Sequence, residues 1–290
     1  MNVVVVGAGA WGTAFTHLLR GRGHDVELAS RATIDDAPYE DAELVVIAVP
    51  SNAFREVLDH VRGSAPVLSL VKGLDPESGE RLSTLVQGRP VAVLSGPNMA
   101  EEVLAGLPGA TVIASEDEAL ALHLQEAINS LAFRVYVNSD LIGVEICAAA
   151  KNVIGLSAGG VDGLGLGDNA KAALITRGLV EMARLGEALG AEPETFSGLA
   201  GMGDLVVTCW HPSGRNRRAG ELIARGATPD EARAEIGQVV EGLTTAPVLR
   251  DLSRRIGVEL PITEGVCAVL EGMPLDGLLA SLMGRRPTGE

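Results

Sequence analysis

Residues 2–14 read NVVVVGAGAWGTA, and this stretch determines the predicted fold of the first half of the chain. Four consecutive valines indicate a buried strand, and Gly7, Gly9 and Gly12 follow it at once. Residues 13–22 then carry apolar side chains at helical spacing, and residues 25–29 form a second strand-like run. A strand, a glycine turn, a helix and a strand within about 30 residues are typical of a dinucleotide-binding unit.

Each glycine of this turn has its own role in such a unit. Gly7 permits the tight turn, Gly9 lets the backbone approach a pyrophosphate, and Gly12 lets the helix pack closely on the strand. The helix N-terminus offers free N–H groups and the positive end of its dipole to the phosphates. We therefore predict a Rossmann-like domain that binds NAD(P). A glycine turn without a ligand is the alternative.

The end of the second strand bears on which dinucleotide binds. An Asp or Glu at this point usually holds the ribose 2′-hydroxyl of NAD. Here Ser30 and Arg31 stand instead, and Glu27 lies earlier in the strand, where it should point elsewhere. A serine and an arginine suit a 2′-phosphate, so NADP(H) is favoured and NAD(H) remains possible.

Polar turns follow several of the later strands. We expect strands at residues 44–49, 67–70, 91–94 and 111–114. Lys72 comes after the second of these, and Gly96 and Asn98 come after the third. Because ligands bind outside the carboxyl ends of strands in open α/β sheets, these turns should line one crevice. Lys72 and Asn98 are therefore candidate site residues.

The second half of the chain has helical spacing and many small residues. The expected fold class is α/β, with a Rossmann-like dinucleotide-binding domain at residues 1–140 and an all-helical domain at residues 141–290. We expect Gly159-Gly160 to end the first helix, Asp168 to cap the second, residues 200–203 to form a flexible turn and Asp204 to cap the helix after it. Helices are predicted at residues 142–157, 170–189, 220–224, 229–236, 246–256, 262–270 and 275–283.

Lysine is rare in this chain, with three lysines against twenty arginines. Unlike arginine, a desolvated lysine can give up its proton near neutral pH, so Lys72, Lys151 and Lys171 are candidates for proton transfer. Lys151 lies in a helix of apolar and small residues, where burial should lower its pKa. The alternative is that codon bias removed most lysines from the chain and that these three remain by chance.

Two further polar groups stand out in the helical half. Asp204 and Thr208 are four residues apart, so they share one face if the segment is helical. Gly214 opens the basic stretch GRNRR, in which Arg215 and Asn216 could bind a phosphate. The alternative for this stretch is a solvated helix start.

Composition excludes several classes of protein. A net charge of −15 argues against binding to nucleic acid or to an anionic membrane. The three cysteines are far apart and indicate reduced thiols in a cytoplasmic protein, and the five histidines lack the spacing of metal ligands, so no metal is expected. The apolar runs are too short to span a bilayer, and a strand from residue 2 is not the pattern of a signal peptide.

Longer motifs give the chain a family resemblance. These motifs span most of the chain: GAGAWGTA (7–14), VKG (71–73), SGPNMAEEV (95–103), AAAKNVIGLSAG (148–159), AALITRGLVEMARLGEALGA (172–191), GLAGMGDLVVTC (198–209), RNRRAG (215–220) and VVEGLTT (239–245). In these motifs and their order, the chain resembles the bacterial-type NAD(P)-dependent glycerol-3-phosphate dehydrogenases.

The resemblance implies a role for each matching residue. Lys151 would be the proton acceptor in oxidation of glycerol 3-phosphate and the donor in reduction of dihydroxyacetone phosphate, with Asp204 orienting it and Thr208 nearby. The residues implied to bind substrate are Lys72, Gly96, Asn98, Gly214, Arg215 and Asn216. The residues implied to bind the cofactor are Gly7, Gly9, Ala10, Trp11, Gly12, Arg31, Lys72, Ala100, Arg215, Val239 and Glu241. We also expect a homodimer.

The chain departs from the family pattern at two places. Gly214 occupies a position where the family usually has serine, and Ser213 stands one residue early. The segment between Arg31 and Leu44 is shorter than usual and lacks a Tyr-Leu-Pro-Gly stretch, which trims the adenosine side of the cofactor site. Two other functions remain open: a dehydrogenase of a 2-hydroxy or 3-hydroxy acid, which the basic stretch argues against, and a non-catalytic NADP(H) sensor.

Overall fold

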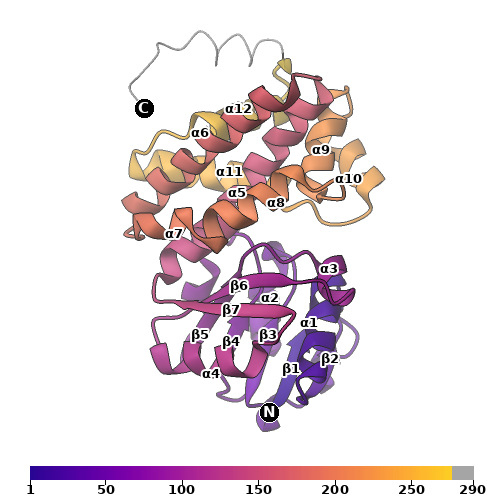
Figure 1. Cartoon of the computed structure of the whole chain (residues 1–290), viewed down its shortest axis with the longest axis vertical. Coiled ribbons are helices and arrows are strands. Elements are labelled where there is room, and N and C mark those ends of the chain that lie inside the picture. The colour runs from indigo at the N-terminus through magenta and orange to yellow at the C-terminus, as the bar shows by residue number, and fades with distance from the viewer. Residues whose placement is uncertain (276–290) are drawn as a thin grey trace.

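The computed structural model describes residues 1–275, and its first half is a twisted, mostly parallel sheet (Figure 1). Within these residues seven strands pair in the order β2-β1-β3-β4-β5-β6-β7, and every pairing is parallel except that of β5 with β6. The strands are β1 (Asn2–Val6), β2 (Asp25–Ala29), β3 (Leu44–Ile47), β4 (Val67–Ser69), β5 (Val91–Ser95), β6 (Gly109–Ala114) and β7 (Phe133–Asn138). The α/β class predicted from the sequence is confirmed.

The valine run of β1 is explained by a core on both faces of the sheet. Val3 and Val5 pack in one cluster with Phe15 of the following helix, whereas Val4 and Val6 pack in a second cluster on the other face. A strand buried on both faces has no need of polar alternation. Four consecutive valines therefore suit a central parallel strand.

Strand β7 was not predicted. Its residues alternate between buried and exposed from Phe133 to Tyr136, since β7 lies at the edge of the sheet. Two predicted strands also end earlier than expected, at Ile47 and Ser69, although the next residue of each still donates a backbone hydrogen bond to the neighbouring strand.

Helices cover this sheet and connect its strands (Figure 1). Helix α1 starts at the glycine turn, with Gly9 at its N-cap. Besides the strands, the described elements of this half are four short turns of 3₁₀ helix and four helices. These are η1 (Ile34–Asp36), η2 (Tyr39–Asp41), η3 (Ser51–Ala53), η4 (Leu82–Leu85), α1 (Ala10–Gly21), α2 (Phe54–His60), α3 (Ala100–Leu104) and α4 (Glu118–Ile128).

The second half is helical and packs around α5 (Figure 1). Among the described residues, α5 alone is long and apolar enough to cross a membrane, and 89% of that stretch is buried inside the protein. The elements are α5 (Leu141–Gly163), α6 (Gly167–Ala188), α7 (Pro193–Ser197), the π-helical turn η5 (Leu199–Gly203), α8 (Asp204–Trp210), α9 (Arg215–Ala224), α10 (Pro229–Ile236), α11 (Glu241–Ile256) and α12 (Pro261–Leu270).

Helix α5 does not end at Gly159-Gly160, as the sequence predicted, but continues to Gly163. A Cβ on Gly159 would lie 1.8 Å from the carbonyl oxygen of Arg217, and one on Gly220 would lie 1.8 Å from that of Leu156. These glycines are therefore needed for the close crossing of α5 and α9, and they do not terminate the helix.

Other helix boundaries also differ from the prediction. Asp168 lies inside the first turn of α6, whose N-cap is Leu166, and Asp204 is the first residue of α8. Residues 200–203 belong to the π-helical turn Leu199–Gly203. Helices α9 and α11 begin five residues earlier than expected, at Arg215 and Glu241. The helix predicted at residues 275–283 lies outside the described residues after its first position.

Polar contacts join the sheet to the helical half. The buried carboxylate of Glu145 on α5 accepts hydrogen bonds from Arg81 Nη1 (2.8 Å) and from the backbone N–H of Ser83 (2.9 Å). Glu241 at the start of α11 accepts hydrogen bonds from Ser51 N (3.0 Å) and Ser51 Oγ (2.7 Å). We propose the domain boundary at residue 140, between the end of β7 and the start of α5.

Candidate active site

Lys72 occupies the centre of the contact between the two halves. It follows β4 by three residues, and its Nζ donates hydrogen bonds to the backbone oxygen of Gly96 (3.1 Å) and to Asn98 Oδ1 (2.9 Å). It also donates to Asp204 Oδ2 of α8 (2.8 Å). The turns after β4 and β5 therefore do meet at one place, as expected for the carboxyl ends of neighbouring parallel strands.

Lys151 approaches the same aspartate from the helical half. Its Nζ donates to Asp204 Oδ1 (2.6 Å) and to Thr208 Oγ1 (2.9 Å). Lys151 and Asp204 are both buried. Because Asp204 and Thr208 lie one turn apart on α8, a single helix face supplies both partners.

Burial and charge together perturb the pKa values of this cluster. Burial lowers the pKa of Lys151 to about 8; the charge of Asp204 opposes this effect, and the charge of Lys72 adds to it. Burial would raise the pKa of Asp204, but the charges and hydrogen bonds of Lys151 and Lys72 outweigh it and lower that pKa. The arrangement therefore holds an ionised carboxylate beside an ammonium that can release its proton near neutral pH.

A chain of side-chain amides runs from this cluster to the basic stretch. Asn152 Nδ2 donates to the backbone oxygen of Lys72 (2.7 Å), and Asn216 Nδ2 donates to Asn152 Oδ1 (2.9 Å). The backbone N–H of Gly242 donates to Asn216 Oδ1 (2.8 Å), which fixes the orientation of both amides. Asn152 was not among the predicted site residues. Its position beside Lys151 on a buried helix was the available signal.

Arg215 and Gly214 lie at the start of α9. The exposed Arg215 donates through Nη1 to the backbone oxygen of Val239 (3.0 Å). Gly214 is the N-cap of the helix, and a Cβ there would lie 3.1 Å from the backbone oxygen of His211. Ser213 is exposed, and its hydroxyl lies 3.0 Å from His211 Nδ1. The close backbone neighbours of this N-cap position therefore account for glycine at 214, where the family usually has serine.

The glycine turn fits a dinucleotide. Gly7 has φ +116°, and a Cβ on it would lie 2.3 Å from the oxygen of Ala48, while a Cβ on Gly12 would lie 1.8 Å from the oxygen of Gly7. Gly9, in contrast, has open space beside it. The first turn of α1 leaves its N–H groups without intrahelical acceptors, and the buried Nε1 of Trp11 has no hydrogen-bond partner. These unpaired donors suit an anionic, hydrogen-bonding cofactor.

The other residues implied to bind the cofactor lie in separate segments. Ala10 is exposed at the start of α1, and Arg31 is exposed in the turn after β2. Ala100 begins α3, which packs against α1. Val239 is 40% exposed, and Glu241 is bound to Ser51 as described above. The contact of Glu241 with Ser51 was not predicted.

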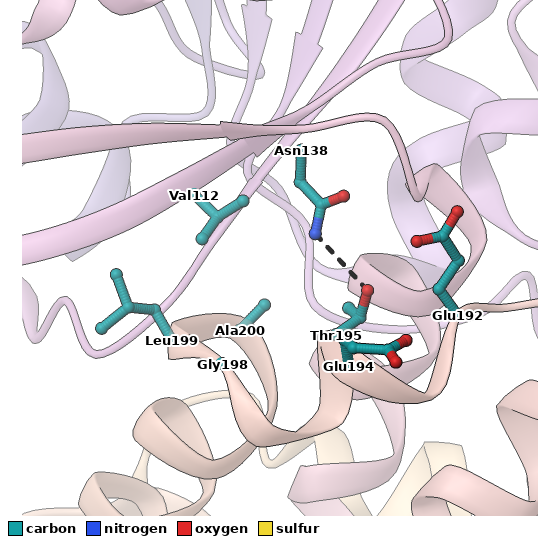
Figure 2. Close-up of a pocket in the computed structure, with 8 residues that line it drawn as sticks. All are labelled: Val112, Asn138, Glu192, Glu194, Thr195, Gly198, Leu199 and Ala200. Carbon is teal, nitrogen blue, oxygen red and sulfur yellow. Dashed lines mark hydrogen bonds between the residues drawn. The ribbon is translucent and has the colours of Figure 1, made fainter.

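A cavity of about 280 Å³ lies beside the π-helical turn η5, and Leu199 and Ala200 of that turn line it (Figure 2). The Asn138 amide points toward Thr195 there and donates to its Oγ1 at 3.4 Å. Neither Lys151 nor Asp204 reaches this cavity, so it is separate from the lysine–aspartate cluster. Its lining consists of Val112, Asn138, Glu192, Glu194, Thr195, Gly198, Leu199 and Ala200. Across residues 1–275, no group of three or more His, Cys, Asp or Glu side chains could hold a metal ion.

Comparison with known proteins identifies the family. The family model "NAD-dependent glycerol-3-phosphate dehydrogenase C-terminus" matches residues 140–277, and the corresponding N-terminal model matches residues 33–121. The chain is 45% identical to a glycerol-3-phosphate dehydrogenase [NAD(P)+] of Symbiobacterium thermophilum, over 98% of this chain and 94% of that protein. It is 41% identical to one from Halorhodospira halophila, over 100% of this chain and 98% of that protein.

Solved structures agree with this result. The crystal structure of glycerol-3-phosphate dehydrogenase from Coxiella burnetii has a TM-score of 0.92 and 36% identity, covering 98% of this chain and 99% of that one. A D-mandelate dehydrogenase with NADH is 14% identical with a TM-score of 0.61, over 96% of this chain and 100% of that one, and shares the fold alone. The chain therefore belongs to the NAD-dependent glycerol-3-phosphate dehydrogenase family.

Proposed function

We propose that this chain catalyses the reversible NAD(P)-dependent oxidation of sn-glycerol 3-phosphate to dihydroxyacetone phosphate. The observation that carries the proposal is the buried Lys151 ammonium, held by Asp204 and Thr208. The next residue, Asn152, connects the backbone of Lys72 to Asn216 at the start of α9. A proton donor close to a phosphate-binding stretch suits a phosphorylated ketone. Family membership supports the same reaction.

Lys151 is the proposed general acid and base. In the reduction, the nicotinamide, when bound, supplies the hydride to C2 of the ketone. The electron pair of the C=O bond moves to the oxygen, and that oxygen takes a proton from Lys151 Nζ. In the oxidation, neutral Lys151 accepts the hydroxyl proton. General acid–base catalysis of this kind contributes roughly 10²–10⁴-fold to the rate, and a pKa of about 8 lets one residue serve both directions.

Asp204 and Lys72 prepare Lys151 for this role. Asp204 orients the ammonium and balances its charge, and Thr208 holds the same Nζ from a second direction. Lys72 binds the other oxygen of Asp204, together with Gly96 and Asn98. A fixed positive charge at Lys72 also favours the negative charge that develops on the substrate oxygen.

The start of α9 is the proposed anchor for the substrate phosphate. Arg215 supplies an exposed guanidinium, and Asn216 has a second amide hydrogen beyond the one it donates to Asn152. Gly214 is the N-cap of this helix, and the unpaired N–H groups at the helix N-terminus favour a bound anion. Together these groups give a chain of net charge −15 a local site for a dianion.

The cofactor would be held by segments from both halves. Gly7, Gly9, Ala10, Trp11 and Gly12 would bind the pyrophosphate side, and Ala100, Arg215, Val239 and Glu241 would border the remainder. We propose NADP(H) as the preferred cofactor because Arg31 and Ser30 stand where NAD-binding proteins usually carry a carboxylate.

The cellular role is a further part of the proposal. We propose that the chain acts in the cytoplasm, as a homodimer, and supplies glycerol 3-phosphate for phospholipid synthesis by reducing the ketone. Cys147, Cys209 and Cys267 are unpaired and buried, which agrees with a reducing compartment. Light scattering of the purified protein would test the dimer.

The direct test is the rate of NADPH oxidation with dihydroxyacetone phosphate, run beside NADH and beside unphosphorylated dihydroxyacetone. We expect fast turnover that requires the phosphate and is faster with NADPH. Equal rates with NADH would contradict the role of Arg31. NADPH binding without turnover of the phosphorylated ketone would contradict the proposed reaction and leave the fold unaffected.

A further inference from the structure

The third lysine, Lys171, has no part in the reaction proposed above, yet it is as buried as Lys151. It lies in the first turn of α6, and its Nζ donates to both carboxylate oxygens of Asp162 on α5, at 3.0 and 2.8 Å. Burying an ammonium is costly unless it is fully paired. A lysine kept at this position therefore has a structural or functional reason.

Asp162 also receives a second cation. Arg217 Nε lies 3.2 Å from Asp162 Oδ2, and Arg217 Nη1 donates to Glu221 one turn further along α9 (3.1 Å). Arg217 directly follows the two proposed phosphate ligands, Arg215 and Asn216. Through Asp162, Lys171 is thus connected to the first turn of the helix that would bind the phosphate.

Lys171 makes a second contact with the segment that leads into this helix. Its Nζ lies 4.9 Å from the ring centroid of Trp210, the last residue of α8, in a cation–π contact. Residues 211–216 connect Trp210 to Arg217. One ammonium therefore contacts one end of this connection directly and the other end through Asp162.

Helices α5 and α9 contact each other through backbone and through side chains. They approach closely at Gly159 and Gly220, where backbone meets backbone. Asn216 of α9 is already held by Asn152 of α5 and by the backbone N–H of Gly242. The ion pair of Arg217 with Asp162 is a second link between the two helices, one residue further along α9. It lies next to Arg215 and Asn216, so a change at Asp162 should be felt at both side chains.

We propose that Lys171 is a positioning residue for the substrate phosphate: it holds both ends of residues 210–217 and so orients Arg215 and Asn216. This inference rests on the proposed function. Lys171 acts only through Asp162, Arg217 and Trp210, so its effect should appear with a phosphorylated substrate and not with an unphosphorylated one.

The test compares two substrates in Lys171→Met, which removes the charge and keeps the length of the side chain. For dihydroxyacetone phosphate, kcat/KM should fall by about 10- to 100-fold, mostly through KM, since small displacements of binding groups are costly. For dihydroxyacetone, kcat/KM should change by less than about twofold. Lys171→Arg keeps both the ion pair and the cation–π contact and should restore most of the loss.

Several results would overturn the inference. Equal losses with both substrates would indicate general disruption, and an unchanged KM for the phosphorylated ketone would remove Lys171 from phosphate positioning. If Lys171→Met fails to fold, Trp210→Leu replaces it, because Trp210 is 45% exposed and its substitution removes the cation–π contact while leaving the Lys171–Asp162 ion pair in place. An unchanged KM in Trp210→Leu would then contradict the inference. Failure of the wild type to reduce dihydroxyacetone phosphate would instead contradict the proposed function itself.

Discussion

Lys151 and Lys171 are both buried lysines that bind an aspartate of the helical half, but their surroundings differ. Asp204, the partner of Lys151, is shared with a second ammonium, that of Lys72, and a threonine hydroxyl completes the set. Asp162, the partner of Lys171, binds that ammonium through both oxygens and also pairs with Arg217, and the Trp210 ring faces the same ammonium. Each aspartate therefore faces two cations, and the two sites differ in that Lys171, unlike Lys151, binds both oxygens of its carboxylate and contacts an aromatic ring.

This comparison shows how neighbouring groups decide what a buried lysine can do. Burial lowers the pKa of Lys151 to about 8 against the opposing charge of Asp204, and the second ammonium, that of Lys72, adds to the lowering. A bidentate carboxylate and an aromatic face make Lys171 suited to holding elements together. The sequence singles out both lysines in the same way, as rare residues in an arginine-rich chain. Their different contacts appear only in the fold.

The largest expected effect is that of Lys151→Ala. Turnover of dihydroxyacetone phosphate should fall by roughly 10²–10⁴-fold, because the variant lacks the proposed proton donor. NADPH binding, followed by fluorescence titration, should stay close to that of the wild type. Turnover above about a tenth of the wild-type value would remove Lys151 from proton transfer.

Arginine substitution at the two sites gives the sharpest contrast. Lys151→Arg should lower turnover by about 10²-fold, because a guanidinium keeps its proton at neutral pH. Lys171→Arg should stay within about threefold of the wild type, since Arg can form the same ion pair and cation–π contact. Steady-state rates of the two variants under one set of conditions give this comparison. Equal losses of turnover in both variants would contradict the distinction between Lys151 as a proton donor and Lys171 as a positioning residue.

Arg215→Ala should raise KM for dihydroxyacetone phosphate by about 10- to 100-fold, as expected for a lost charged hydrogen bond to the phosphate. The value of kcat/KM for unphosphorylated dihydroxyacetone serves as the control and should change little. Arg218→Ala is a matched variant, since Arg218 is also exposed near the start of α9. If both arginine variants show the same KM, the anchor is not Arg215.

Much of the fold could be predicted because its signals are local. The valine run and Gly7, Gly9 and Gly12 define strand, turn and helix within one short stretch. Strand β7 was missed because it lies at the exposed edge of the sheet. The end of α5 was misplaced because Gly159 is explained by α9, which lies far away in the sequence.

The residues of the candidate site were likewise predictable only where a local motif marks them. Lys72, Asn98, Lys151, Asp204 and Thr208 were all selected from local motifs, and the structure brings them together. The contacts of Ser51 with Glu241 and of Asn152 with Asn216 were not predicted. Each joins segments that only the tertiary fold makes neighbours.

The most direct test of the account is the pH dependence of dihydroxyacetone phosphate reduction by the wild-type protein. A donor must carry its proton, so the rate should be level at low pH and fall above a pH of about 8, by up to about tenfold per unit. The oxidation of glycerol 3-phosphate should show the opposite dependence. In Asp204→Asn the fall should move to lower pH, because the carboxylate that raises the pKa of Lys151 is gone. A reduction rate that stays level well above pH 8 would contradict Lys151 as the proton donor.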